Sequence, residues 1–294
     1  MNKSVAFFIV LGLFFNFAHG EINVVTSTSD LAYFADKIGG DLAKVGSIAS
    51  PKSDIHFVEV RPSYMAKLAR ADIVFKVGMG LDQWMDQLID GSRNSKLTIV
   101  DCSKYIEPLE VPTFKADARH GDIHPEGNPH YWIGPQNTES ILKAVTEGLA
   151  SVDPANDSVY RSNMAILLDG ITASVSGMQS RTDRLKGIEI IYYHNSWPYF
   201  NEFTGLHAAG FIEPYPGVPP SPSHVKKMIE LVGNRKIKII AMEPYFDRRV
   251  PDKIANETGA EIVVLYPSIG GRQKGETYQD WLEGNIDALL EKLE

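Results

Sequence analysis

Cysteine is nearly absent from this chain of 294 residues, which contains Cys102 alone. A single cysteine excludes an intramolecular disulfide, and its position excludes a lipid-modified N-terminal cysteine. Basic residues are also in deficit, because 29 Lys and Arg stand against 37 Asp and Glu, for a formal net charge of −8. This balance argues against a nucleic-acid partner, whose phosphates favour a basic surface, and it is compatible with a cation as ligand.

The sequence also lacks the roughly 20 consecutive apolar residues that a membrane-spanning helix needs. The apolar run from Val5 to Phe17 is too short, follows the positive Lys3, and ends in small residues at Ala18-His19-Gly20 that suit a cleavage site. An uncleaved anchor is the alternative, but no charged stop-transfer flank follows the run. We therefore expect residues 1–20 to be a cleaved secretory signal peptide and the mature protein to be periplasmic, monomeric and without a lipid anchor.

Strand and helix patterns alternate in both halves of the remaining chain, which predicts an α/β fold of two lobes. Each lobe is expected to hold a parallel sheet of about four strands flanked by helices. The first lobe would comprise residues 21–152 and the second residues 187–294. The expected strands are 22–25, 45–49, 73–77 and 97–100, then 188–193, a segment around Phe211, 237–242 and 262–265.

The expected helices have recognisable ends. Ser29 can cap the first of them, and Gly39-Gly40 can end it. The alternation of strands and helices pauses between the lobes, where a helical pattern that opens after Pro154 could run for about 30 residues. We expect this segment, residues 153–186, to be one long rigid helix that joins the two lobes.

Three histidines lie where α/β proteins bind ligands. His56 is in the loop after the second expected strand, His130 is in the long connection before the helix near Asn137, and His194 directly follows a strand. Open α/β sheets bind ligands beyond the carboxyl ends of their strands, so these side chains can meet in one crevice. Singly, each is more often a hydrogen-bonded loop residue. Together they predict a tetrahedral metal site, completed by a carboxylate or water.

The three histidines lie in motifs that follow one another in a fixed order. The first is SDIHFVEVRPS at 53–63, with ADIV at 71–74 and GMGLDQW at 78–84; the others are GNPHYWIGP at 127–135 and YHNSWPYF at 193–200. These motifs resemble the metal-ligand regions of the zinc and manganese solute-binding proteins of ABC transporters. The resemblance covers essentially the whole mature chain.

The resemblance implies two α/β lobes with a metal ion in the cleft between them, and an ABC membrane permease as partner. It carries ligand roles onto His56, His130 and His194. One place departs from the family pattern, since the turn that usually supplies a carboxylate as fourth ligand reads Leu265-Tyr266-Pro267-Ser268. Glu243, at the end of a strand in the same lobe, is the candidate substitute. Asp247, Glu59 and water are the alternatives.

A set of ligands rich in histidine and poor in carboxylate favours Zn²⁺ over Mn²⁺, which prefers hard oxygen ligands. Affinity order alone does not separate zinc from copper or nickel. We therefore predict high-affinity capture of zinc and its delivery to the permease, and no enzyme activity. A zinc hydrolase built on the same histidines is an alternative, but no His-Glu-x-x-His or Gly-x-Ser-x-Gly motif supports it. A manganese-binding or adhesin-like relative is another.

Further histidines have simpler interpretations. His120 and His124 precede His130 in the loop 115–129. They could form a weak gathering site that passes metal inward, but we interpret the loop as solvated. We assign His207 and His224 to helix surfaces or caps.

Overall fold

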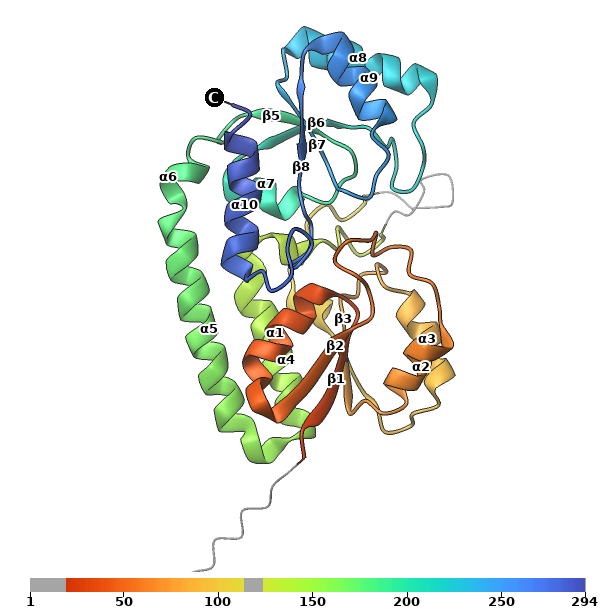
Figure 1. Cartoon of the computed structure of the whole chain (residues 1–294), viewed down its shortest axis with the longest axis vertical. Coiled ribbons are helices and arrows are strands. Elements are labelled where there is room, and N and C mark those ends of the chain that lie inside the picture. The colour runs from red at the N-terminus through yellow and green to blue at the C-terminus, as the bar shows by residue number, and fades with distance from the viewer. Residues whose placement is uncertain (1–19, 114–123, 294) are drawn as a thin grey trace, which may run out of the picture.

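The computed structural model describes residues 20–113 and 124–293 of the chain, and the predicted signal peptide therefore lies almost wholly outside the described residues. Two lobes stand one above the other (Figure 1), and each is built on a parallel sheet of four strands. The predicted α/β class is confirmed. The first sheet has the order β2-β1-β3-β4, with strands β1 (Ile22–Thr26), β2 (Ala43–Ser47), β3 (Ile73–Lys76) and β4 (Thr98–Asp101).

The second sheet repeats this arrangement in the order β6-β5-β7-β8. Each predicted strand is present, with ends that differ by a few residues at most. The residues of β7 are buried throughout, as expected for a parallel strand covered on both faces. The strands of this sheet are β5 (Glu189–Tyr192), β6 (His207–Phe211), β7 (Ile239–Met242) and β8 (Glu261–Val264).

The helices of the first lobe show one correction to the predicted ends. Thr28, and not Ser29, is the N-cap of the first helix, since its hydroxyl accepts a hydrogen bond from the backbone N–H of Leu31. The helix ends at Gly39 as predicted, and Gly40 follows with a positive φ of 51°. These helices are α1 (Ser29–Gly39), α2 (Pro62–Leu68), α3 (Trp84–Ser92) and α4 (Thr138–Val152).

The linking segment contains a shorter helix than predicted. Helix α5 (Asp157–Gly177) has 21 residues, and the short α6 (Gln179–Thr182) follows after Met178. In Figure 1, α5 runs along the side of the first lobe and leads up to the second. The Asn163 side chain donates a hydrogen bond to the carbonyl of Ile38 in the first lobe. Arg181 of α6 forms an ion pair with Asp287 of the C-terminal helix.

The second lobe contains a helix that the sequence analysis did not predict, α7, directly after the third histidine motif. The C-terminal helix α10 begins with a capping box formed by Thr277 and Asp280. Its first turn packs against the first lobe, where the rings of Tyr278 and Phe34 lie 5.7 Å apart. The helices are α7 (Pro198–Thr204), α8 (Pro222–Arg235), α9 (Arg249–Thr258) and α10 (Tyr278–Leu290).

One apolar core continues from lobe to lobe. It contains Phe75 of the first sheet, Ile190 of the second and Trp281 of α10. A separate, smaller core that includes Val232 and Ile254 lies under α8 and α9. A wide opening of the lobes would expose part of the shared core to water and is therefore unfavourable. Among the described residues, no helix combines the length and the apolar character needed to cross a membrane.

Candidate metal centre

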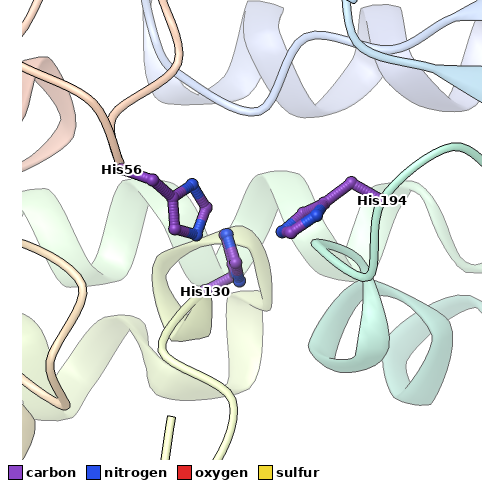
Figure 2. Close-up of side chains that lie close together, drawn as sticks. All are labelled: His56, His130 and His194. Carbon is purple, nitrogen blue, oxygen red and sulfur yellow. The ribbon is translucent and has the colours of Figure 1, made fainter. Parts of the chain in front are cut away.

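The three predicted histidines meet at one point between the lobes (Figure 2). Each of His56, His130 and His194 offers a ring nitrogen, and these nitrogens all lie within 4.8 Å of one another. The ring centroids are 5.0 to 5.5 Å apart. Such an arrangement can hold a metal ion. Zinc binds imidazole nitrogens at about 2.0–2.1 Å, and in a tetrahedral site the nitrogens approach the ion from different directions.

His56 lies in a turn that follows β2, and its side chain is almost fully buried. Asp54 fixes it through two hydrogen bonds. The Oδ1 atom of Asp54 lies 3.0 Å from the backbone nitrogen of His56 and 2.8 Å from its Nδ1 atom. The Nε2 atom of His56 is buried and has no hydrogen-bond partner among the described residues.

His130 is held in the same way by Asn128. The Oδ1 atom of Asn128 lies 3.1 Å from the backbone nitrogen of His130 and 2.9 Å from its Nδ1 atom. A short 3₁₀ helix, Tyr131–Ile133, follows directly and anchors the segment. The hydroxyl of Tyr131 donates to the carbonyl of Val77 in the first lobe, and the indole of Trp132 donates to that of Pro267 in the second.

His194 follows β5 and comes from the second lobe. Its Nδ1 atom lies 2.8 Å from Oε2 of Glu213, which stands two residues after the end of the neighbouring strand β6. The backbone N–H of Glu213 donates to the carbonyl of Tyr193, so the sheet itself places the two side chains side by side. Both side chains are nearly buried.

The three hydrogen bonds assign the protons of the imidazole rings. A carboxylate or an amide oxygen only accepts hydrogen bonds, so each Nδ1 carries the proton and donates it. In the neutral form of each ring the lone pair is then on Nε2, which is left to bind a metal. Partners of this kind orient metal-binding histidines and raise their basicity. Asp54, Asn128 and Glu213 therefore orient three imidazole rings for a common ligand.

The charges around the group also suit a cation. Burial, followed by repulsion from the other histidines, lowers the pKa of His130 well below its ordinary value. His130 is therefore neutral and releases no proton when it binds a metal. Burial alone would also lower the pKa of His194, but its hydrogen bond to Glu213 and the charge of Glu243 raise it. A doubly charged metal ion bound to His194 can take the place of the second proton of its ring and interact favourably with the charges of Glu213 and Glu243.

Glu243, the candidate fourth ligand, directly follows β7 and is completely buried. Its Oε1 atom accepts a hydrogen bond from the indole of Trp197 at 2.9 Å. Burial, partly offset by the charge of His194, raises its pKa to about 7. Glu243 therefore lies near His194, but it is not part of the group whose ligand atoms lie within 4.8 Å of one another.

The other candidates for a fourth ligand are engaged elsewhere. Glu59 and Asp247 are exposed and form ion pairs with Arg61 and Arg249. The turn 265–268 supplies no carboxylate. The carbonyl of its Pro267 instead accepts the hydrogen bond from Trp132.

The structure corrects two interpretations of the remaining histidines. His124 is buried, with 8% of its surface exposed, and is not part of a solvated loop. His207 lies exposed in strand β6, not on a helix. His224 does lie in the first turn of a helix, where its Nε2 atom contacts the carbonyl of Phe211. His120 lies outside the described residues.

Sequence reasoning missed the partners of the histidines, although part of the signal was readable. Asp54 and Asn128 each stand two residues before a predicted ligand, a spacing at which a short polar side chain can bond to the local backbone. Glu213 lies 19 residues from His194. Only the pairing of β5 with β6 brings these two together.

Two cavities reach the histidines. The larger, of about 390 Å³, is lined by His124, His130 and His194 and by the carboxylates of Glu110 and Glu213. The smaller, of about 150 Å³, is lined by His56 and His194. Three imidazoles, each held by a side-chain oxygen and placed between two α/β lobes, define the class of two-lobed proteins that bind a metal ion in a cleft.

Comparison with known proteins identifies the family. Residues 24–292 match the family described as zinc-uptake complex component A, periplasmic (ZnuA). The match covers nearly the whole chain, and the chain belongs to this family of solute-binding proteins of metal ABC transporters. The predicted resemblance is confirmed.

Individual relatives share about a quarter of their residues with this chain. The iron-binding protein YfeA of Yersinia pestis is 25% identical, over 92% of this chain and 85% of its own length. The manganese-binding lipoprotein MntA of Halalkalibacterium halodurans is 22% identical, over 92% of this chain and 88% of its own. A crystal structure of ZnuA has a TM-score of 0.77 at 25% identity and covers 93% of this chain and 98% of its own.

These comparisons establish a divalent metal-binding component of ABC-type metal uptake. The relatives are named as binding proteins, not as enzymes, in agreement with the predicted capture. Their names differ in the metal, however, and include zinc, manganese and iron.

The predicted location is contradicted by the same comparisons. The MntA protein and several streptococcal relatives are named lipoproteins. The expectation that the protein lacks a lipid anchor is therefore contradicted, whereas the matched family is itself described as periplasmic. That expectation relied on the leader, which lies outside the described residues up to residue 19, and on the position of one cysteine.

Proposed function

We propose that this protein captures a zinc ion with His56, His130 and His194 and delivers it to the membrane permease of an ABC transporter. The lobes in this proposal are residues 21–152 and 187–294, linked by residues 153–186. His56 and His130 belong to the first lobe and its connection, and His194 to the second. An ion held by all three ties the lobes together, and this loaded form is what the permease recognises.

The observation that carries the proposal is the common orientation of the three rings. Each Nδ1 atom is occupied by a side-chain oxygen at 2.8 or 2.9 Å. Each Nε2 atom therefore remains available, and the buried Nε2 of His56 lacks a partner among the described residues. A buried acceptor without a partner costs free energy, which a bound metal ion would recover.

The choice of zinc follows from the ligand atoms. Three imidazole nitrogens form a borderline-soft set that suits zinc, whereas manganese favours sites dominated by carboxylate and water oxygens. Asp54 and Glu213 carry the carboxylates closest to the rings, but they are occupied by hydrogen bonds to Nδ1 atoms. In this proposal they act on the metal only through the imidazoles.

The experiment that tests the proposal is zinc titration of the full chain by calorimetry. The variants His56→Ala, His130→Ala and His194→Ala each remove a ligand. Each should therefore lose more zinc affinity than the roughly 10–100-fold typical of changes to the hydrogen-bond partners of metal ligands. His207→Ala, at an exposed histidine of β6, is the matched control. Wild-type affinity in all three variants would overturn the site.

Metal choice is tested separately. Protein purified without an affinity tag is analysed for its metal content, and zinc then competes with manganese for the demetallated protein. Zinc should displace manganese at equal concentrations. If manganese binds as tightly as zinc, the choice of zinc fails while capture by the three histidines stands.

A further inference from the structure

A fourth histidine lies against the three described above. The His124 ring stacks on that of His56, with centroids 5.7 Å apart and planes inclined by 29°. This separation is close to the 5.0–5.5 Å between the rings of the group itself. His124 is 8% exposed and lines the same cavity as His130 and His194. It therefore belongs to the surroundings of the centre.

The backbone holds His124 in this place. Its carbonyl accepts a hydrogen bond from the N–H of Gly127, which closes a tight turn. The next residue, Asn128, is tied to the carbonyl of Leu109 at 2.8 Å and also carries the bond to His130. His124 and His130 are thus presented by two ends of one anchored segment.

One edge of the His124 ring faces a loop of the first lobe. A Cβ atom built on Gly80 would lie 3.4 Å from Nδ1 of His124, so this edge of the ring packs against the loop of Gly80. The Nε2 atom is on the opposite edge of the imidazole. The nitrogens of His56, His130 and His194 lie within 4.8 Å of one another, and His124 is not part of this group. To bind the same ion, the His124 ring must rotate about its side-chain torsions.

The centre also needs another ligand. Zinc in a protein is usually four-coordinate, and three imidazoles leave one position open. The turn 265–268 has no carboxylate, and Glu243, whose Oε1 accepts a hydrogen bond from the indole of Trp197 while its buried Oε2 has no hydrogen-bond partner among the described residues, is the competing candidate. Among the described residues that surround the three histidines, His124 adds a fourth imidazole at comparable distance.

We propose that His124 is the fourth zinc ligand of this centre, so that the ion is bound by four imidazoles. The inference rests on the proposed function, because it assumes that the other three histidines bind zinc. A neutral fourth ligand leaves the full double charge of the ion to be balanced by Asp54, Glu213 and Glu243 around the rings. It also makes the set richer in nitrogen, which disfavours manganese.

X-ray absorption spectroscopy of the zinc-loaded full chain is the direct test. The wild-type spectrum should fit four imidazole ligands, and the spectrum of His124→Gln should fit three with an oxygen ligand in place of the fourth. Three imidazoles in the wild-type protein would overturn the inference. This measurement on the wild type does not depend on how well any variant folds.

Zinc affinity provides the second test. His124→Gln removes a ligand, so its loss of zinc affinity should exceed the roughly 10–100-fold typical of changes to the hydrogen-bond partners of ligands, and His207→Gln should bind zinc as well as the wild type does. Manganese affinity should change less than zinc affinity. An unchanged zinc affinity in His124→Gln would overturn the inference. If His56→Ala lost zinc affinity in the same experiment, the proposed function would still stand. If His56→Ala also kept its affinity, the proposed function itself would fail.

Discussion

The Oε2 atom of Glu213 lies 2.8 Å from the Nδ1 atom of His194, although 19 residues separate the two in the sequence. Each lies two residues after the end of its strand, and the two strands are adjacent and parallel, so the pairing of β5 and β6 sets their distance. A nearly buried carboxylate in this position orients the imidazole and makes its Nε2 atom a stronger donor to a metal. The sheet of the second lobe thus contributes to the centre through a residue that itself offers no atom to the ion.

Replacing this carboxylate by an amide should weaken zinc binding without destroying the site. Glu213→Gln keeps an oxygen that can accept the Nδ1 proton but removes the charge. We expect zinc to bind about 10–100-fold more weakly, measured by calorimetry. Glu230→Gln is the control, because Glu230 is exposed on α8 and pairs only loosely with Lys226. Equal effects of the two substitutions would show that net charge, and not the bond to His194, is responsible.

Helix α4 packs so closely on β3 that one of its glycines has no room for a methyl group. A Cβ atom on Gly148 would lie 2.5 Å from the Phe75 ring and 3.1 Å from Ile73. Gly148→Ala should therefore lower the free energy of unfolding by about 1–3 kcal/mol, as overpacked cores do. Denaturant titration measures this change.

The matched control is Gly170→Ala in the exposed interior of α5, where the nearest atom would be 3.9 Å away. Alanine there should raise stability by up to about 1 kcal/mol, because it favours the helix more than glycine does. If Gly148→Ala were as stable as Gly170→Ala, the close packing of α4 on β3 would be refuted.

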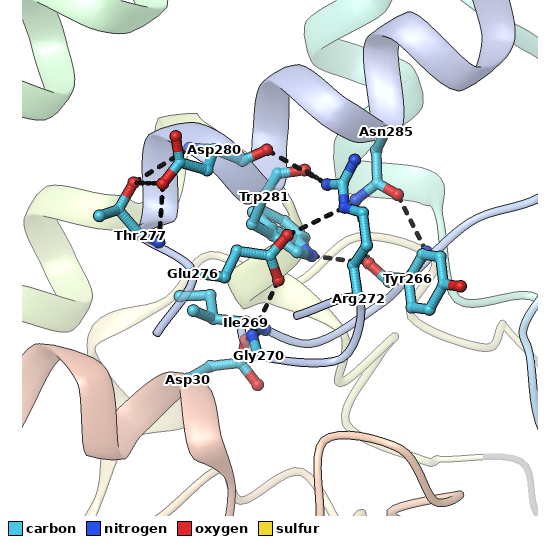
Figure 3. Close-up of polar contacts among 10 residues, drawn as sticks. All are labelled: Asp30, Tyr266, Ile269, Gly270, Arg272, Glu276, Thr277, Asp280, Trp281 and Asn285. Atoms are coloured by element: carbon cyan, nitrogen blue, oxygen red, sulfur yellow. Dashed lines mark hydrogen bonds and ion pairs between the residues drawn. The ribbon is translucent and has the colours of Figure 1, made fainter. Parts of the chain in front are cut away.

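A buried acid, Asp30, joins the two lobes. Asp30, in the first turn of α1, accepts a hydrogen bond at 2.8 Å from the backbone N–H of Ile269 in the second lobe. Figure 3 shows the surrounding network, in which Glu276 accepts from the N–H of Gly270 and from Arg272. Burial raises the pKa of Asp30 to about 7, although the bond from Ile269 acts in the opposite direction.

This raised pKa predicts a loss of stability with rising pH. Between about pH 4 and pH 7 the folded protein keeps the proton on Asp30, whereas the unfolded chain has released it. The folded state then binds more protons, so the free energy of unfolding falls as pH rises, by at most about 1.4 kcal/mol per pH unit from this group. The contribution is fully present below pH 4 and is lost by about pH 7.

The variant Asp30→Asn isolates this effect. It keeps an acceptor for Ile269 but cannot ionise, so its stability relative to the wild type should increase from pH 4 to pH 7 and then stay constant. Denaturant titrations across this range measure the difference. Asp169→Asn, at an exposed position of α5, should run parallel to the wild type. A constant difference between Asp30→Asn and wild type at all pH values would contradict the raised pKa.

The sequence predicted the strands and the three histidines because both depend on local pattern. Runs such as Ile239–Met242 are apolar throughout, and His194 directly follows such a run. Helix α7 was missed because seven residues are too few for a helical period to be recognised. The burial of His124 could not be predicted, since its neighbours His56 and Gly80 come from distant loops. The composition of a loop does not reveal what covers it.

Zinc itself should stabilise the folded protein, because an ion bound by histidines of both lobes binds the folded state and not the unfolded chain. Zinc at a hundredfold excess over its dissociation constant should add about 2.7 kcal/mol to the free energy of unfolding. For a chain of this size that corresponds to a rise in Tm of about 5–10 °C. A chelator should reverse the shift, and a variant lacking His56, His130 and His194 should show none. A shift of equal size in that variant would mean that zinc stabilises the protein from another place.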